Sequence, residues 1–326
     1  MKKNTRISQD ISITSDKAKY DEACKRLLAN KVILSWIMKD CLDEYRGYGI
    51  DEIEKFIEAE PQISSVGVDT DTTNVPPLKG KIIAGMNNED VTVTEGTVRY
   101  DIHFFAMVPK RNEYIKIIVN VEAQNKYDPG YPIPKRGFYY CSRMISAQKG
   151  IEFEDSHYED IKKVYSIWIC MQAPAGSRNS ITRYTIKEEN LVGNVKRDLK
   201  DYDLMTVIMI ALGDESDQNY QGSIKLLDVL FSRESSTKQK KQILQDEFQI
   251  NMTKNMESEV EDMCNLSQGI EERGIAIGEE RGIVIGKMET LKNLMNSTGW
   301  DMQKVMEMMG MDAEEQEKYK RLLEQQ

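Results

Sequence analysis

The chain has 326 residues, of which 40% are hydrophobic and 30% charged. This composition excludes a disordered chain and allows one packed domain of about 200 residues with a smaller second unit. No apolar run approaches the roughly 20 residues that span a bilayer, and the start, MKKNTRISQD, lacks the apolar stretch of a signal peptide. We therefore expect a soluble, cytoplasmic protein with no membrane contact.

Charge, histidine and cysteine narrow the function classes further. A formal net charge of −10 speaks against a uniformly basic nucleic-acid binder, although basic residues outnumber acidic ones between residues 110 and 149. Two histidines, His103 and His157, are too few for a histidine-based zinc site and a poor basis for a serine–histidine–acid triad. The five cysteines have no paired short spacing, so we expect buried thiols. Hydrolytic chemistry would then depend on carboxylates.

The residue pattern predicts three parts: a polar N-terminal segment (1–24), a main domain (25–215) and a helical C-terminal region (216–326). Apolar residues at helical spacing predict a long helix and then a short one over 17–57. The following elements are then predicted in chain order: a loop (69–77), successive strands (81–124), a helix (135–148), a buried strand (162–172) and, near the end of the chain, a small helical hairpin.

Two of these strands are predicted to form an antiparallel hairpin. TVRYDIHFFAMV and YIKIIVNVEAQ flank the turn-like PKRNE, and a turn centred between Arg111 and Asn112 sets Asp101 opposite Glu122. Alternation then gives one apolar face, made of Tyr100, Ile102, Phe104, Ala106, Val108, Ile115, Ile117, Val119, Val121 and Ala123. Asp101, Glu122 and Gln124 fall on the other face.

Facing carboxylates repel each other unless a cation or a proton lies between them. Two carboxylates about 5 Å apart on neighbouring strands suit a hard divalent cation, Mg²⁺ with Mn²⁺ as a substitute. Gln124, two residues further on, can orient a water molecule or contact a phosphate. The alternative is a pair of solvated charges on an exposed sheet face.

The succession EGTVRYD, IVNVEAQ, YPIPKRGFYYCSRMISAQKG and YEDIKKVYSIWIC closely resembles the PD-(D/E)XK nuclease family transposases, the Rpn-like recombination-promoting nucleases of bacteria. The resemblance covers roughly residues 25–215. It implies a mixed α+β fold: a restriction-endonuclease-like αβββαβ core with a central mixed sheet, followed here by the helical C-terminal region. It also implies a Mg²⁺-dependent endonuclease that cleaves phosphodiester bonds of double-stranded DNA in recombination or transposition.

Carried over residue by residue, the resemblance makes Asp101 and Glu122 the metal-binding acids. Gln124 takes the place of the usual lysine and lacks its positive charge. Tyr100, not proline, precedes Asp101. Many members of the superfamily add an acid from the first helix, for which Glu44 is the candidate. Glu89 and Asp90 are alternatives, and for all three a solvated surface position is the competing interpretation.

Arg136, Tyr140 and Arg143 recur at spacings of four and three, which places them on one helical face. They can bind DNA phosphates through charge-assisted hydrogen bonds, or the arginines can brace the sheet by pairing with Asp101 or Glu122. Both interpretations remain open at this point.

An octapeptide repeat, EERGIAIGEERGIVIG, occupies residues 271–286 and has glycine at every fourth position. A helix with such a stripe can approach another helix closely, so we expect a self-association or spacer helix and a homo-oligomer formed through the C-terminal helices. The alternative is a repeat produced by replication slippage without a selected role.

A second function class also remains: a DNA-binding or protein-interaction module on a catalytically inactive nuclease fold.

Overall fold

The computed structural model describes residues 6–63, 89–92, 96–99, 101–110, 113–213, 220–232 and 235–324. The chain divides into two compact units, Met1–Ser267 and Gln268–Gln326. The predicted mixed α+β class and the helical C-terminal region are confirmed. The predicted loop over 69–77 and the turn residues Arg111 and Asn112 lie outside the described residues.

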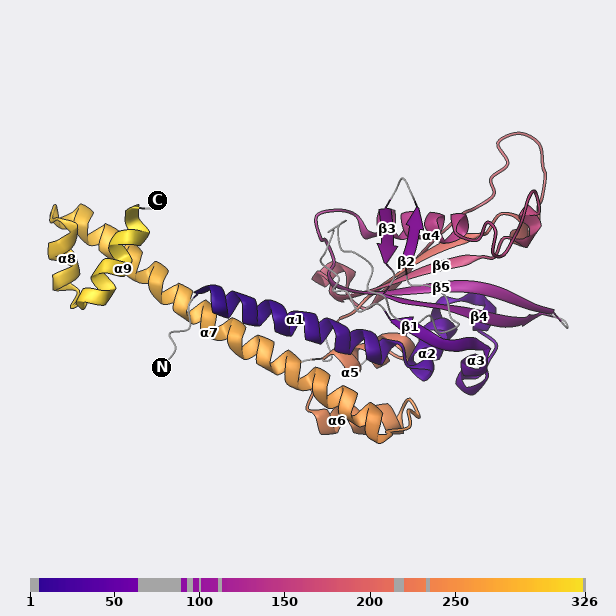
Figure 1. Cartoon of the computed structure of the whole chain (residues 1–326), viewed down its shortest axis with the longest axis horizontal. Helices are drawn as coiled ribbons and strands as arrows, with labels where there is room; N and C mark the ends of the chain where they lie inside the picture. The colour runs from indigo at the N-terminus through magenta and orange to yellow at the C-terminus, as the bar shows by residue number, and fades with distance from the viewer. Residues whose placement is uncertain are drawn as a thin grey trace. The chain divides into compact units, whose positions relative to one another are not determined.

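A six-stranded mixed sheet forms the centre of the first unit (Figure 1). Its strands, in the spatial order β1-β4-β5-β6-β8-β7, are β1 (Ile57–Ile63), β4 (Ile102–Lys110), β5 (Glu113–Lys126), β6 (Val164–Gln172), β8 (Met205–Ala211) and β7 (Ser180–Thr185). β5, β6 and β8 run parallel, so their carboxyl ends lie at one edge. β1, β4 and β7 pair antiparallel. A separate hairpin joins β2 (Glu89–Thr92) to β3 (Gly96–Arg99).

The β4–β5 hairpin has the predicted register. Ile102 pairs with Val121, and Lys110 pairs with Glu113 next to the turn. Every member of the predicted apolar face whose side chain the structure describes is buried, namely Ile102, Phe104, Ala106, Val121 and Ala123. The hairpin is therefore anchored in the core by the face that the alternation predicted.

Four helical segments precede the sheet: α1 (Arg6–Leu28), α2 (Lys31–Cys41), the 3-10 turn η1 (Asp43–Tyr45) and α3 (Ile50–Phe56). The polar start is thus helical from Arg6 onward. The predicted long helix is broken because Asn30 caps a new one: its Oδ1 accepts a hydrogen bond from the Val32 backbone N–H at 3.0 Å. α2 buries most of its apolar residues, namely Ile33, Leu34, Ile37, Met38 and Cys41.

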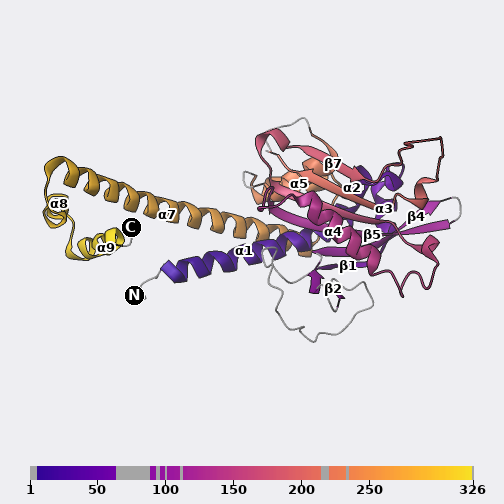
Figure 2. The same ribbon diagram turned by 90° about the horizontal axis from the view of Figure 1, so that it is seen from above.

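Helix α4 (Ile133–Ser146) follows β5 and lies across the sheet, as Figure 2 shows from above. A Cβ on Gly137 would come within 2.6 Å of Val207 Cγ1 and 3.0 Å of Trp168 Nε1, so glycine allows α4 to approach β6 and β8 closely. The buried cluster beneath α4 consists of Ile133, Tyr140, Cys141, Met144, Val164, Trp168, Cys170, Val207 and Met209. The predicted buried strand is confirmed as β6.

The C-terminal helices are α5 (Gly222–Phe231), α6 (Thr237–Asp246), α7 (Lys254–Thr298), α8 (Met302–Met308) and α9 (Ala313–Glu324). The first unit extends to Ser267, beyond the predicted boundary at 215, because α5 packs against α2 and buries Leu226 and Leu227. The second unit contains the predicted helical hairpin. Its core includes Met288, Leu291, Val305, Met306, Met311 and Tyr319, so three of its methionines are core residues.

Two further expectations concern membranes and thiols. In the described ranges, no helix combines the length and the apolar character needed to cross a bilayer. The cysteines are free thiols; four are buried and Cys264 is partly exposed. Burial raises the pKa of Cys170 to about 12, so this thiol stays protonated and unreactive at neutral pH.

Candidate functional site

Asp101 lies directly before β4 and exposes only 5% of its surface. Its Oδ2 accepts a hydrogen bond from the backbone N–H of Ala123 at 3.1 Å. The β4–β5 register, continued by one residue, sets Asp101 opposite Glu122. The backbones of the two predicted acids are therefore neighbours. The side chains of Glu122 and Gln124 lie outside the described residues; their backbones pair in register with Trp168 and Cys170 of β6.

A cation already contacts the Asp101 carboxylate. Lys25 Nζ of α1 lies 2.8 Å from Asp101 Oδ1 and 3.4 Å from Asp21 Oδ2. The side chains of Lys25 and Asp101 are 2% and 8% exposed. Asp101 is therefore not a solvated surface charge, which excludes the alternative interpretation for this residue.

Asp21 and Lys25 were not predicted from the sequence. A signal was present, because an acid and a lysine four residues apart flank Cys24 and precede Leu27 and Leu28 on a helix. Charged residues next to apolar helix positions are usually assigned to the solvent face, yet these two are buried. Buried charges must be paired, and Asp101 provides the partner.

The donor set around Asp101 fits a divalent cation that is held only in part by protein. Lys25 contacts Oδ1 and the Ala123 N–H contacts Oδ2, and a carboxylate oxygen can accept more than one interaction. Mg²⁺ commonly binds one or two carboxylates and completes its octahedron with water and phosphate oxygens. No group of three or more His, Cys, Asp or Glu able to hold a metal is present among the described side chains, to which Glu122 does not belong.

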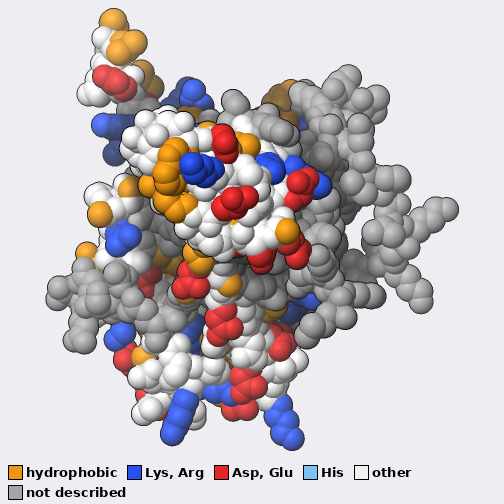
Figure 3. All heavy atoms as spheres, turned by 90° about the vertical axis from the view of Figure 1, so that its left-hand side faces the viewer, with side chains coloured by type: hydrophobic (Ala, Val, Ile, Leu, Met, Phe, Trp, Pro, Cys, Tyr) orange, Lys and Arg blue, Asp and Glu red, His pale blue; other side chains and the backbone are white. Residues whose placement is uncertain are grey.

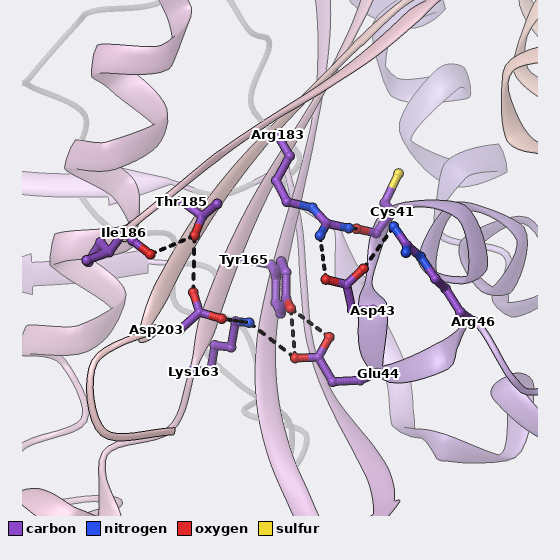
Figure 4. Close-up of polar contacts among 10 residues, drawn as sticks. All are labelled: Cys41, Asp43, Glu44, Arg46, Lys163, Tyr165, Arg183, Thr185, Ile186 and Asp203. Carbon is purple, nitrogen blue, oxygen red and sulfur yellow. Dashed lines mark hydrogen bonds and ion pairs between the residues drawn. The ribbon is translucent and has the colours of Figure 1, made fainter. Parts of the chain in front are cut away.

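Glu44, the candidate first-helix acid, lies in another cluster (Figure 4). The Tyr165 hydroxyl lies 2.8 and 2.7 Å from its two carboxylate oxygens, and Lys163 Nζ lies 3.2 Å from Oε1. Lys163 also pairs with Asp203 at 2.6 Å. These contacts connect η1 to β6 and to the segment before β8. Glu44 and Asp101 thus have different partners, and a metal-ligand role for Glu44 stays a prediction. Glu89 and Asp90 lie in β2, but their side chains are outside the described residues.

A second ion pair in the same region joins β7 to η1. Arg183 Nη1 lies 2.5 Å from Asp43 Oδ2, and its Nη2 donates to the Cys41 carbonyl at 2.7 Å. The hydrogen bond from Arg183 holds the pKa of the Asp43 carboxyl below its usual value. Figure 4 shows Arg183 reaching from β7 toward this turn. The two pairs together fasten the N-terminal helices to the far half of the sheet.

The predicted phosphate-binding residues of α4 are largely enclosed. Arg136 Nε and Nη2 donate to the Tyr140 hydroxyl at 3.0 and 2.6 Å, and Nη1 donates to the Tyr131 hydroxyl at 2.6 Å. Its guanidinium also lies 5.4 Å from the Trp168 ring centroid. Arg143 is 3% exposed. Burial of Arg143 argues against a phosphate contact from that residue, whose Nη1 lies 3.4 Å from the Tyr139 hydroxyl, and its pairing with Asp101 or Glu122 stays a prediction. Arg136 is half-buried.

A hollow of about 580 Å³ lies where β5, β6 and β8 end, and its lining includes Tyr127, Asp128, Gln172, Arg178 and Gly213. Gln124 is two positions before the last residue of β5, so its backbone lies near this edge. Ligands of open α/β sheets commonly bind at the carboxyl ends of parallel strands. The described part of this lining contains both an acidic residue, Asp128, and a basic residue, Arg178. It therefore does not favour an anionic ligand over a cationic one.

Charge on the face drawn in Figure 3 does not indicate a ligand. On the face drawn in Figure 3, acidic and basic side chains are intermingled among the described residues, and no continuous basic surface is visible there. Comparison with known proteins found no matching family, no matching curated protein and no matching solved structure. The resemblance to recombination-promoting nucleases therefore depends on the quoted motifs alone.

Proposed function

We propose that the protein is a Mg²⁺-dependent DNA endonuclease that acts in recombination or transposition. One observation carries the proposal: Asp101 is a carboxylate with only 5% of its surface exposed, at the point where the hairpin register sets it opposite Glu122. A buried acid at a predicted catalytic position is typical of functional sites. Burial of a charge costs free energy, so buried charged residues are found mainly where they have a role.

The order of the elements supports a restriction-endonuclease-like core. After the N-terminal helices come the antiparallel strands β1, β4 and β5, then α4, then β6, which pairs parallel with β5. This succession is the αβββαβ order that the resemblance implies. The small β2–β3 hairpin is inserted between β1 and β4, and β7 and β8 extend the sheet on the far side.

In this proposal Asp101 and Glu122 would hold the metal, and Gln124 would orient a water molecule. A bound Mg²⁺ would supply a water of lowered pKa and stabilise the leaving oxygen of the phosphodiester. Gln124 donates and accepts hydrogen bonds without adding charge. Double-stranded DNA is the proposed substrate, and Arg136, which is half-buried, is the better placed of the two α4 arginines to contact a phosphate.

The test is cleavage of supercoiled plasmid by the purified full chain with Mg²⁺. We expect nicked or linear product from the parent and at least a hundredfold lower rate for Asp101→Asn, as is common when one metal-binding acid is lost. Asp160→Asn, which changes an exposed acid of similar size, is the matched control and should cut like the parent. An uncut plasmid, or equal cutting by Asp101→Asn, would refute the proposal.

A specific observation favours a second candidate, a catalytically inactive DNA-binding or interaction module. The Lys25 ammonium contacts the Asp101 carboxylate, as a salt bridge in a decayed site would. Calorimetric titration with Mn²⁺ separates the two candidates. Binding that is lost in Glu122→Gln supports the nuclease, whereas no binding at millimolar Mn²⁺, either in the parent or in a variant without the Lys25 charge, supports the inactive module.

We also propose that α7 associates with a second copy of the chain. Three isoleucines of the octapeptide repeat expose more than half of their surface, namely Ile275 (55%), Ile283 (60%) and Ile285 (58%). A Cβ added at Gly278, Gly282 or Gly286 would meet no described atom within 4 Å. An exposed apolar side chain gains about 1.5–3 kcal/mol when it is fully buried, so a partner helix would stabilise this segment.

A further inference from the structure

We propose that Lys25 is the resident cation of the Asp101 site and that its charge limits how tightly the site binds a divalent metal. The inference deepens the proposed function and rests on it, because it concerns metal binding at Asp101. It adds two residues of α1, Lys25 and Asp21, that regulate the site without being metal ligands.

The contacts make Lys25 part of the site. Its ammonium lies 2.8 Å from Asp101 Oδ1, within charge-assisted hydrogen-bond distance, and its side chain is only 2% exposed. Water therefore does little to screen its charge. The same carboxylate is fixed from the other side by the Ala123 N–H. Lys25 and the backbone of β5 together hold Asp101 in one orientation.

A metal bound to Asp101 would lie on the carboxylate that Lys25 already contacts. Two positive charges would then share one buried group, and their repulsion is strong where the effective dielectric constant is low. Lys25 also orients Asp101, but the net free energy of one charge-assisted hydrogen bond is small compared with the repulsion between two cations at low dielectric constant. The repulsion from Lys25 therefore weakens metal binding more than its orientation of Asp101 strengthens it. Removal of the ammonium should strengthen metal binding.

Asp21 provides Lys25 with an alternative partner. It lies one helical turn before Lys25 on α1, with its Oδ2 3.4 Å from Nζ and 10% of its side chain exposed. When a divalent cation occupies Asp101, Lys25 can move toward Asp21 and remain paired. The negative charge of Asp21 should thus favour metal binding, both by attracting the metal and by holding Lys25.

The position of Lys25 also relates to Gln124. Gln124 is uncharged, and Lys25 supplies a positive charge next to Asp101 from a different element of the fold. Because Lys25 is buried and contacts the Asp101 carboxylate, it acts through Asp101 and is a positioning residue. The site would then bind metal weakly until the phosphate oxygens of the substrate add their negative charge.

The experiment is isothermal titration of the full chain with Mn²⁺, which does not depend on cleavage. Lys25→Met removes the charge and keeps the length of the side chain, and we expect its Kd to be at least tenfold lower than that of the parent. Asp21→Asn should raise the Kd at least threefold. Lys25→Arg keeps the charge and should bind within about twofold of the parent, and Lys17→Met, an exposed lysine of the same helix, should not change the Kd.

These outcomes distinguish the inference from a merely structural role, which would weaken binding in both Lys25→Met and Asp21→Asn. Circular dichroism checks that each variant is folded; should Lys25→Met not fold, Lys25→Gln, which also removes the charge, takes its place and should likewise lower the Kd. A parent that binds Mn²⁺ through Asp101, with Lys25→Met unchanged or weaker or Asp21→Asn unchanged or tighter, overturns this inference alone. No Mn²⁺ binding by the parent or any variant overturns the proposed metal site and this inference with it.

Discussion

The contact between Tyr165 and Glu44 can be tested by a substitution that removes a single heavy atom, the Tyr165 hydroxyl oxygen. Tyr165→Phe removes the hydroxyl that lies 2.8 and 2.7 Å from the two Glu44 oxygens and leaves the ring in the core (Figure 4). Burial, followed by the nearby Glu44 carboxylate, raises the pKa of Tyr165 above its usual range. The hydroxyl is therefore a permanent donor, and the substitution removes a charge-assisted hydrogen bond at every physiological pH.

The expected loss follows from the surroundings of Glu44. A hydrogen bond to a charged group contributes about 1.5–3 kcal/mol. Glu44 keeps Lys163 as a partner, and its side chain is 22% exposed, so water replaces part of the lost interaction. We therefore expect the lower part of the range, a decrease of about 1.5–2 kcal/mol in the free energy of unfolding.

Urea unfolding followed by circular dichroism measures this difference, with the slope m unchanged. Tyr158→Phe is the matched control, because Tyr158 is 64% exposed and the same atom is removed. It should lie within about 0.5 kcal/mol of the parent. If Tyr165→Phe were as stable as Tyr158→Phe, the hydroxyl would contribute nothing and the cluster would not fasten η1 to the sheet.

Two other predictions follow from ion pairing and from the repeat. Arg183→Met should destabilise the protein by less than about 1 kcal/mol at pH 7, because Asp43 is more than half exposed. The lowered pKa of Asp43 means that the stability it contributes is present above its unfolded pKa and is lost as the pH falls through the folded value. The difference from the parent should therefore shrink in acid to the part that the hydrogen bond to the Cys41 carbonyl contributes, and a difference that does not depend on pH would contradict this. Replacing Ile275, Ile283 and Ile285 together with Gln should reduce an oligomeric parent to a monomer in light scattering while helicity stays the same, and equal masses would contradict association through α7.

Local pattern was sufficient to predict the β4–β5 hairpin. The strict alternation in both strands and the polar turn between them leave one register that buries a single apolar face. Ile102, Phe104 and Val121 are buried as that register requires. β6 could be predicted equally well, since a continuous apolar run indicates a strand covered on both faces.

Strands at the edges of the sheet were harder to predict. β1 reads IEAEPQI, with two acids and a proline, and its pairing with β4 shifts register between Glu58 and Gln62. β7 reads SITRYT and is mostly exposed. Edge strands tolerate proline, irregular pairing and polar residues because only one side is paired, so their sequences resemble loops.

Only those residues of the candidate site that lie in one element or one hairpin could be predicted from the sequence. Asp101 and Glu122 follow from the register, but Lys25 comes from a helix far away in the sequence, and no local pattern links it to Asp101. The partners of Glu44 could not be predicted for the same reason, because Lys163 and Tyr165 lie in or next to β6, far from Glu44 in the sequence. Tertiary pairing of charges is a property of the folded chain and not of spacing.

The contribution of α1 to the site has a consequence for how the protein is handled and made. Lys25 leaves the ribosome before Asp101, so α1 carries a lysine that finds its final partner only after the hairpin has been synthesised. A shortened chain that began after Lys25 would lose the cation that pairs with the buried Asp101 carboxylate, together with the core residues Tyr20, Ala23 and Cys24. Proteolytic trimming or truncation within the N-terminal helix would therefore act on the candidate site although it leaves the sequence of the hairpin unchanged.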